Sequence, residues 1–182
     1  MGKKRSAAGP KAKKINVELI TDFNSEPYKL LSKMRKENHD EIRDAKIALA
    51  WRTALKPDVD GHLVLGRCVK ASDLQRELAA WDFVIVLNKE MWEAFSFEKE
   101  TATKRREALL DHELCHAALV LDKWGEPKVD EKGRKVFRIR KHDIEEFRGV
   151  VARHGCYKRD LEQFAEAVLK SRQGELTLSA AK

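Results

Sequence analysis

The hydrophobic and polar positions of this chain recur with two different periods, which predict a mixture of helices and strands. Apolar residues recur every three to four positions where helices are expected, over residues 26–38, 72–78, 88–95, 98–122, 142–153 and 158–171. Alternation or a short β-branched run predicts strands, over residues 45–53, 62–69, 83–87 and 136–140. Residues 128–140 are expected to form a hairpin that turns at 130–133. These elements predict an α+β fold.

The first helix and the longest helix have the clearest patterns. Ser25 can cap helix 26–38, and the inner face of this helix carries three apolar residues, Leu30, Leu31 and Met34. Segment 98–122 contains no glycine or proline, and its second half is apolar on nearly every side. A helix of this composition is expected at the centre of a domain.

Length, hydropathy and cysteine content exclude several classes of protein. The 182 residues suffice for one domain, expected over 15–172 between tails at 1–14 and 173–182. No apolar run approaches the roughly 18 residues of a membrane span, and no secretory signal is recognisable. The three cysteines form no Cys-x-x-Cys pair, so we expect a cytoplasmic protein without a disulfide framework.

The positive charge is concentrated at the N-terminus. The net charge is +7, and the first 14 residues hold six basic residues and no acidic one. The remainder of the chain is nearly neutral. A basic arm over residues 3–14 can contact nucleic acid non-specifically through the phosphates. The alternative is a tail that only increases solubility.

Residues 112–116 form a His-Glu-x-x-His motif within the predicted central helix. His112 and His116 are four positions apart, about 40° around a helix, so both imidazoles project from one face. Two such nitrogens can bind one Zn²⁺ at about 2.0 to 2.1 Å. Glu113 is too far round the helix to join them. We therefore expect Glu113 to take a proton from zinc-bound water and to return it to the leaving amine.

The motif also has a purely structural interpretation, in which both imidazoles are hydrogen-bonded core residues. The functional interpretation is favoured because two histidines and a glutamate are costly in the most apolar helix unless they have a role.

A zinc site of this type needs a third protein ligand and one position for water. His142 is the first candidate, because it follows His116 by 26 residues and comes directly after the predicted hairpin, which returns the chain to its starting point. Glu146 and Glu145 are the alternatives, since a carboxylate on a following helix can serve the same purpose.

Three further residues are candidates for supporting roles. Asp111 and Asp143 each adjoin a proposed ligand and can orient an imidazole through a hydrogen bond, although a surface position explains both equally well. Tyr157 can donate a hydrogen bond to a tetrahedral oxyanion.

Three segments together resemble a known family. They are residues 109–119 (LLDHELCHAAL), residues 142–147 (HDIEEF) and the run Arg153-His154-Gly155. The chain resembles the Putative phage metallopeptidase family and, more distantly, the SprT/Spartan-type minimal zinc proteases. The resemblance implies a mostly helical zincin domain with a small antiparallel or mixed sheet beside the motif helix, and host cytoplasm if the chain is phage-encoded. It also implies that His142, followed by Phe147, supplies the third ligand.

The sequence thus predicts a metallopeptidase with one Zn²⁺ per chain, a polypeptide substrate and no membrane association. One alternative is a nucleic-acid-associated binding protein with a structural zinc site and the basic arm. Another is a hydrolase that uses the same site on a non-peptide amide.

Overall fold

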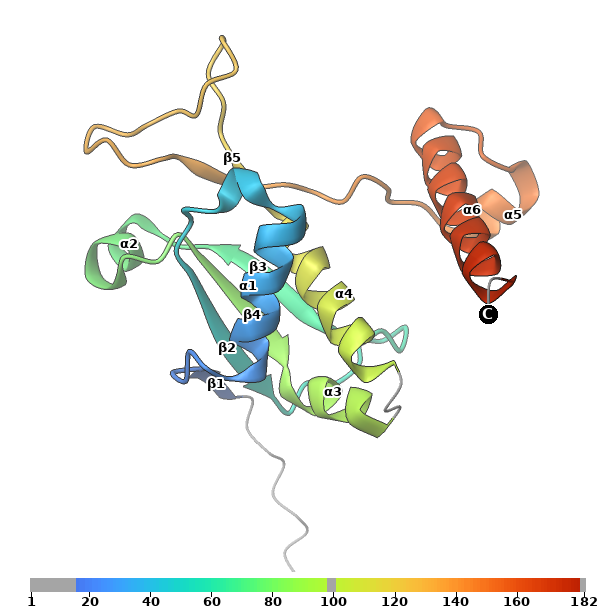
Figure 1. Cartoon of the computed structure of the whole chain (residues 1–182), viewed down its shortest axis with the longest axis horizontal. Helices are drawn as coiled ribbons and strands as arrows, with labels where there is room; N and C mark the ends of the chain where they lie inside the picture. Colours follow the sequence, from blue (N-terminus) through green and yellow to red (C-terminus); the bar gives the residue numbers. More distant parts are fainter. Residues whose placement is uncertain (1–15, 98–100, 181–182) are drawn as a thin grey trace, which may run out of the picture. The chain divides into compact units, whose positions relative to one another are not determined.

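A four-stranded mixed sheet organises the first of two units in the computed structural model, which describes residues 16–97 and 101–180 (Figure 1). The chain divides into residues 1–140 and residues 141–182. The strand order is β1-β2-β4-β3, with the bounds Asn16–Leu19, Ile47–Thr53, Phe83–Asn88 and Gly66–Lys70. The central strands β2 and β4 are parallel, whereas β1 and β3 run antiparallel to their neighbours.

Helices α1 (Glu26–Asn38) and α4 (Ala102–Cys115) lie side by side over one face of this sheet (Figure 1). The core between helices and sheet holds the largest fully buried side chains: Ile42, Leu49, Phe83, Ile85, Leu87, Leu110 and Leu114. The helix 26–38 has the predicted bounds and buries the predicted face. The predicted cap is wrong in one respect, because the Ser25 hydroxyl donates to the carbonyl of Asp22 instead of accepting from the helix.

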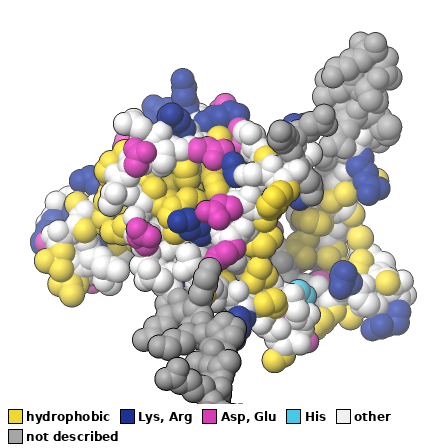
Figure 2. Space-filling view, turned by 90° about the horizontal axis from the view of Figure 1, so that it is seen from below, with side chains coloured by type: hydrophobic (Ala, Val, Ile, Leu, Met, Phe, Trp, Pro, Cys, Tyr) yellow, Lys and Arg dark blue, Asp and Glu magenta, His cyan; other side chains and the backbone are white. Residues whose placement is uncertain are grey.

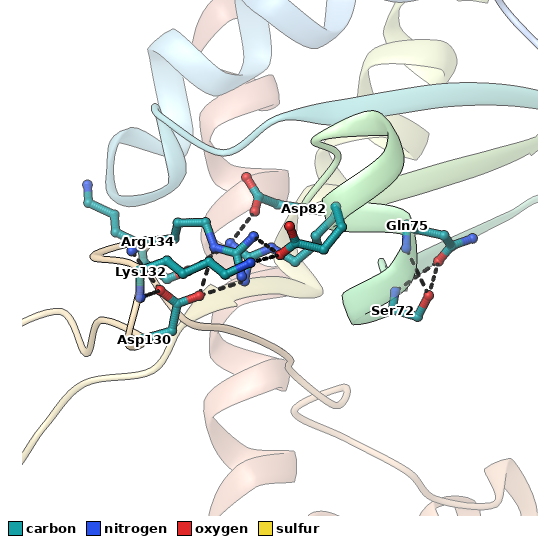
Figure 3. A network of polar contacts seen from close by, with 9 residues as sticks. Ser72, Gln75, Asp82, Asp130, Lys132 and Arg134 are labelled. Atoms are coloured by element: carbon teal, nitrogen blue, oxygen red, sulfur yellow. Dashed lines mark hydrogen bonds and ion pairs between the residues drawn. The ribbon is translucent and has the colours of Figure 1, made fainter.

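Two short helices begin where the sequence predicts them. Helix α2 (Asp73–Ala79) starts with a capping box in which Ser72 and Gln75 exchange hydrogen bonds (Figure 3). Helix α3 (Lys89–Ala94) starts at Asn88, whose side chain accepts from the Met91 N–H. Short 3₁₀ turns, η1 (Asp40–Ile42) and η2 (Phe95–Phe97), follow α1 and α3.

The face of the sheet opposite α1 and α4 leaves apolar side chains exposed. In the strand register, Val17 lies opposite Arg52 and Val69 lies opposite Val84, and paired residues share one face. Val17, Leu19 and Val69 are all exposed. Figure 2 shows the molecule from one side, with hydrophobic patches exposed between charges of both signs.

The longest predicted helix, 98–122, is wrong at its C-terminal end. Helix α4 stops at Cys115, and β5 (Ala117–Leu119) follows it directly. Strand β5 pairs with β6 (Phe137–Ile139) in a second, two-stranded antiparallel sheet. The apolar run 117–121 fits a buried strand as well as a helix, and pairing with a strand about 20 residues away in the chain decides between them.

The hairpin predicted over residues 128–140 is present, and its turn is where it was expected. The Gly133 N–H donates to the Asp130 carbonyl at 2.9 Å, and Gly133 has a φ of 72°, which glycine adopts without strain. Between β5 and β6, isolated antiparallel bridges also join Leu121 to Pro127 and Val129 to Lys135. The chain therefore makes two successive turns between β5 and β6.

The second unit contains helices α5 (Arg148–His154) and α6 (Arg159–Ala180). The helix predicted over 142–153 thus begins six residues later than expected, and the break at His154-Gly155 is confirmed. No described helix has the length and hydropathy to cross a membrane. The described elements confirm the predicted α+β class, and the basic arm at residues 3–14 lies outside the described residues.

Candidate metal centre

The His-Glu-x-x-His motif occupies the last turn of α4, where the helix gives way to β5. The rings of His112 and His116 are 5.1 Å apart between centroids and inclined at 83°. His112 is exposed and His116 is half-buried, whereas Glu113 between them is only 3% exposed. Both imidazoles therefore lie on one side of the helix end, as the i, i+4 spacing predicts, and the carboxylate is directed into the protein.

His116 also connects the helix end to the chain that leaves β6. Its backbone carbonyl accepts from the Arg140 N–H at 2.8 Å, and its ring Nδ1 lies 2.7 Å from the Arg140 carbonyl oxygen. Since a carbonyl can only accept, Nδ1 carries the proton of the neutral ring. The lone pair is then on Nε2, which is the tautomer that a metal ligand requires.

His142 follows Arg140 by two residues. One donor atom from each of His112, His116 and His142 belongs to a group in which all the atoms lie within 4.8 Å of one another. This group contains neither Glu145 nor Glu146. Three imidazoles at this spacing can bind one divalent cation.

The Glu113 carboxylate lies against the start of the edge strand β3. A Cβ added to Gly66 would be 2.6 Å from Glu113 Oε1, closer than real Cβ contacts, so only glycine leaves room for the carboxylate here. Burial raises the pKa of Glu113, while the nearby His116 and a hydrogen bond from the Cys68 backbone N–H act in the opposite direction. Strand β3 thus fixes the position of the carboxylate, and burial makes it more basic than an ordinary glutamate.

Cys68 is buried on the same strand, behind Glu113. Burial, reinforced by the Glu113 charge, raises the pKa of its thiol to about 12. The thiol is therefore neutral at pH 7 and is suited to packing rather than to metal binding or nucleophilic attack.

A cavity of about 590 Å³ opens in front of the motif. His112 and Glu113 contribute the polar groups of its wall, and Arg105 lies at its side. The other lining residues are mainly apolar: Val64, Leu65, Gly66, Phe95, Ala108 and Leu109. A volume of this size accommodates several residues of an extended peptide, and a mostly apolar wall with few polar groups is typical of substrate pockets.

The predicted supporting residue Asp111 contacts helix α1. Its carboxylate lies 2.7 Å from Nε2 of His39, a buried histidine at the end of α1, and accepts from the Asn38 side chain at 3.2 Å. This contact ties α1 to the motif helix. His39 could not be identified as a partner from the sequence, because an isolated histidine has no informative spacing.

The remaining predicted residues lie in the second unit. The Glu146 carboxylate accepts hydrogen bonds from Lys158 Nζ at 2.6 Å, from the Tyr157 hydroxyl and from the Phe147 N–H. These bonds, above all the one from Lys158, lower the pKa of Glu146 to about 2. Glu146 and Tyr157 are thus bonded to each other. Asp143 and Glu145 are exposed.

A second group of potential ligands, which the sequence analysis did not single out, lies in the loop between β2 and β3. Asp58, Asp60 and His62 are all exposed. Asp58 Oδ1 accepts from the backbone N–H groups of Asp60 and His62 at 3.0 and 2.8 Å. This arrangement is an ordinary Asp-stabilised turn.

Comparison with known proteins gives one match. A family model described as Putative phage metallopeptidase matches residues 22–169, which include the motif helix and His142. No curated protein and no solved structure matches the chain.

Proposed function

The chain belongs to the Putative phage metallopeptidase family, and from this premise we propose that it is a zinc-dependent peptidase whose ion is bound by His112, His116 and His142. The observation that carries the proposal is the spacing of these three imidazoles, whose donor atoms lie within 4.8 Å of one another. The polypeptide substrate follows from the peptidase family, and the choice of zinc from the donors.

Zinc fits these donors better than magnesium or calcium does. Magnesium and calcium prefer oxygen ligands, whereas zinc readily takes three histidine nitrogens and keeps a fourth position for water or substrate. The hydrogen bond from His116 Nδ1 to the Arg140 carbonyl supports the same role, because metal-binding histidines usually donate their other N–H to such a partner.

Glu113 has the position and the basicity of a proton carrier. A zinc ion bound by these residues would lower the pKa of a water molecule and polarise the scissile carbonyl. Glu113 would accept a proton from the attacking water as the water oxygen bonds to the carbonyl carbon, and would deliver that proton to the nitrogen as the C–N bond breaks. Contact with Gly66 and the N–H of Cys68 holds the carboxylate in place for both transfers.

Metal content tests the ligand set. We expect one zinc per wild-type chain by mass spectrometry after purification with zinc, and loss of that zinc in His112→Ala, His116→Ala and His142→Ala. Glu145→Ala and Glu146→Ala are matched controls that should keep it. Zinc retained in His142→Ala and lost in either glutamate variant would move the third ligand to a carboxylate.

Hydrolysis tests the reaction. Glu113→Gln should keep its zinc and lose about 10²- to 10⁴-fold of the cleavage rate on an unfolded protein substrate such as casein, since this is the usual contribution of a general acid–base group. Glu107→Gln makes the same change six residues earlier in α4, where Glu107 pairs with Lys33 of α1, and should cleave at the wild-type rate. Equal rates for Glu113→Gln and wild type would refute the assignment.

A further inference from the structure

A second, smaller cavity lies on the face of the sheet opposite α1 and α4. Its volume is about 150 Å³, and apolar side chains such as Val17, Leu65 and Val86 form much of its wall. Two arginines also line it: Arg52 from β2 and Arg67 from β3. In the register both arginines lie on the same face as Val86, on strands that flank β4. This cavity therefore concentrates positive charge in apolar surroundings.

Neither arginine is neutralised by another residue that the structure describes. Among the described residues, none forms an ion pair or a hydrogen bond with the Arg52 or Arg67 side chain, and no Asp or Glu lines the cavity. The Nε of Arg52 is buried without a hydrogen-bond partner. A half-buried guanidinium that lacks a partner is costly. A ligand with a negative charge would supply the missing acceptor.

The two cavities share one wall. Val64, Leu65 and Gly66 line both the arginine cavity and the cavity in front of His112 and Glu113. Asn88 holds this wall in place: its N–H donates to the Leu65 carbonyl at 2.8 Å and its side chain to the Val64 carbonyl at 3.1 Å. The arginine cavity is therefore directly adjacent to the cavity in front of the motif.

We propose that Arg52 and Arg67 form a specificity pocket that binds a carboxylate of the polypeptide substrate, close to the bond that is cleaved. The inference rests on the proposed peptidase function. A guanidinium presents a planar set of N–H donors that matches the two oxygens of a carboxylate. The carboxylate belongs either to an Asp or Glu side chain or to the C-terminus of the substrate, and one set of peptides separates the two sources.

Binding can be measured without cleavage. The zinc-loaded full-length Glu113→Gln protein is titrated with matched sets of fluorescent decapeptides. Each set carries either one internal Glu or one internal Gln at a fixed position, and the other positions are randomised. Each is made with a free and with an amidated C-terminus. We expect the acidic member of the relevant pair to bind about tenfold tighter or more, as charge-assisted hydrogen bonds in a partly desolvated pocket provide. The pair that shows this difference identifies the source of the carboxylate.

The arginines are then replaced one at a time on the same Glu113→Gln background. Arg67→Gln, at an exposed position, should fold normally and abolish most of the preference for the acidic peptide, and Arg52→Gln should do the same. Lys70→Gln is the matched control, because Lys70 is exposed on the same strand but lies outside both cavities. It should retain the preference. If Arg52→Gln fails to fold, Arg67→Gln alone decides the result.

Three outcomes would overturn the inference. The first is equal affinity for acidic and amide peptides. The second is a preference that Arg67→Gln leaves unchanged. The third is tighter binding of a single-stranded oligonucleotide that Arg67→Gln abolishes, which would assign the cavity to phosphate. The peptidase proposal is judged separately. If the wild-type protein cleaves but shows no preference for acidic peptides, only the proposed specificity pocket is refuted. If acidic peptides bind in an arginine-dependent way but no cleavage occurs, only the catalytic assignment is refuted.

Discussion

The motif on α4 and the hairpin beside α2 both contain clustered ionisable side chains, but the pKa values of their carboxylates are shifted in opposite directions. Around α2, Asp82 pairs with Arg76 at 2.8 Å, and Asp130 and Glu77 each pair with Arg134 at 2.8 Å (Figure 3). Hydrogen bonds lower the pKa of Asp130 and of Glu77. The charged forms of Asp130 and Glu77 are thus stabilised by the fold.

Glu113 is in the contrasting situation. It is buried, no Lys or Arg is paired with it among the described residues, and burial raises its pKa. The same type of side chain is therefore held in its charged form beside α2, whereas on α4 burial favours its protonated form. Under the proposed function the α2 network serves stability and the α4 motif serves chemistry. This division can be tested by substitutions that should affect only one of the two.

The largest effect is expected from Gly66→Ala. The added Cβ would lie 2.6 Å from Glu113 Oε1, so the carboxylate must move by a distance on the order of 1 Å. Displacement of a catalytic group on this scale costs about 100-fold in rate. We expect kcat/KM for casein or peptide cleavage to fall by about this factor, with normal folding.

Gly149→Ala is the control for this substitution. Its added Cβ would meet only Arg153, on the same helix of the second unit, so the cleavage rate should match that of wild type. Wild-type cleavage by Gly66→Ala would mean that the contact between Gly66 and Glu113 does not position the carboxylate.

Next in size is Arg76→Ala, which should affect stability and not the chemistry. The Arg76 and Asp82 side chains are only 10% and 11% exposed, so removal of the arginine leaves a nearly buried carboxylate without its cation. We expect a loss of about 2 to 4 kcal/mol in the free energy of unfolding, measured by urea denaturation. The rate of cleavage per folded molecule should not change, and a parallel loss of both quantities would contradict the division between the two regions.

A smaller effect on the free energy of unfolding is expected from acidification. Because the folded-state pKa of Asp130 is lowered below its ordinary value of 3.8, its contribution to stability is complete above that value and is lost as the pH falls through the lowered pKa. The wild-type protein should therefore lose stability on acidification below about pH 4 more steeply than Asp130→Asn. Parallel curves of unfolding free energy against pH would argue against this role for the Asp130 charge.

The smallest effect is expected from Lys132→Ala. Lys132 pairs with Glu77, and its side chain is 60% exposed, so solvent screens the interaction. The denaturation midpoint should be indistinguishable from that of wild type. A large shift would show that the α2 network depends on its exposed members as well as on Arg76 and Asp82.

Local patterns in the sequence predicted much of the fold. The bounds of helix 26–38 follow from periodicity and the starts of α2 and α3 from caps within a few residues, and all three were confirmed, although the Ser25 side chain does not cap the first helix. The end of α4 was not predictable in this way. The apolar residues 117–119 would fit a helix or a strand equally well, and only their pairing with the distant strand at 137–139 selects the extended conformation.

The candidate site likewise has a part that local sequence patterns predict and a part that depends on contacts between residues far apart in the chain. The spacing of His112, Glu113 and His116 is local, and it placed the motif on one helix. The neighbours of Glu113 are not local: Gly66 and Cys68 precede it by more than 40 residues and become its partners only through the packing of β3 against α4. No period or motif in the sequence marks such a contact.

The bonds between His116 and Arg140 have one more consequence, for protein engineering. They join the two ends of the segment that connects β5 to β6. The length of the turns within this segment is therefore not coupled to the orientation of the His116 imidazole. Doubling the length of a flexible loop costs only about 0.6 kcal/mol. The tip beside Trp124, which is 76% exposed, is therefore where a fluorophore or a grafted recognition peptide should be tolerated best.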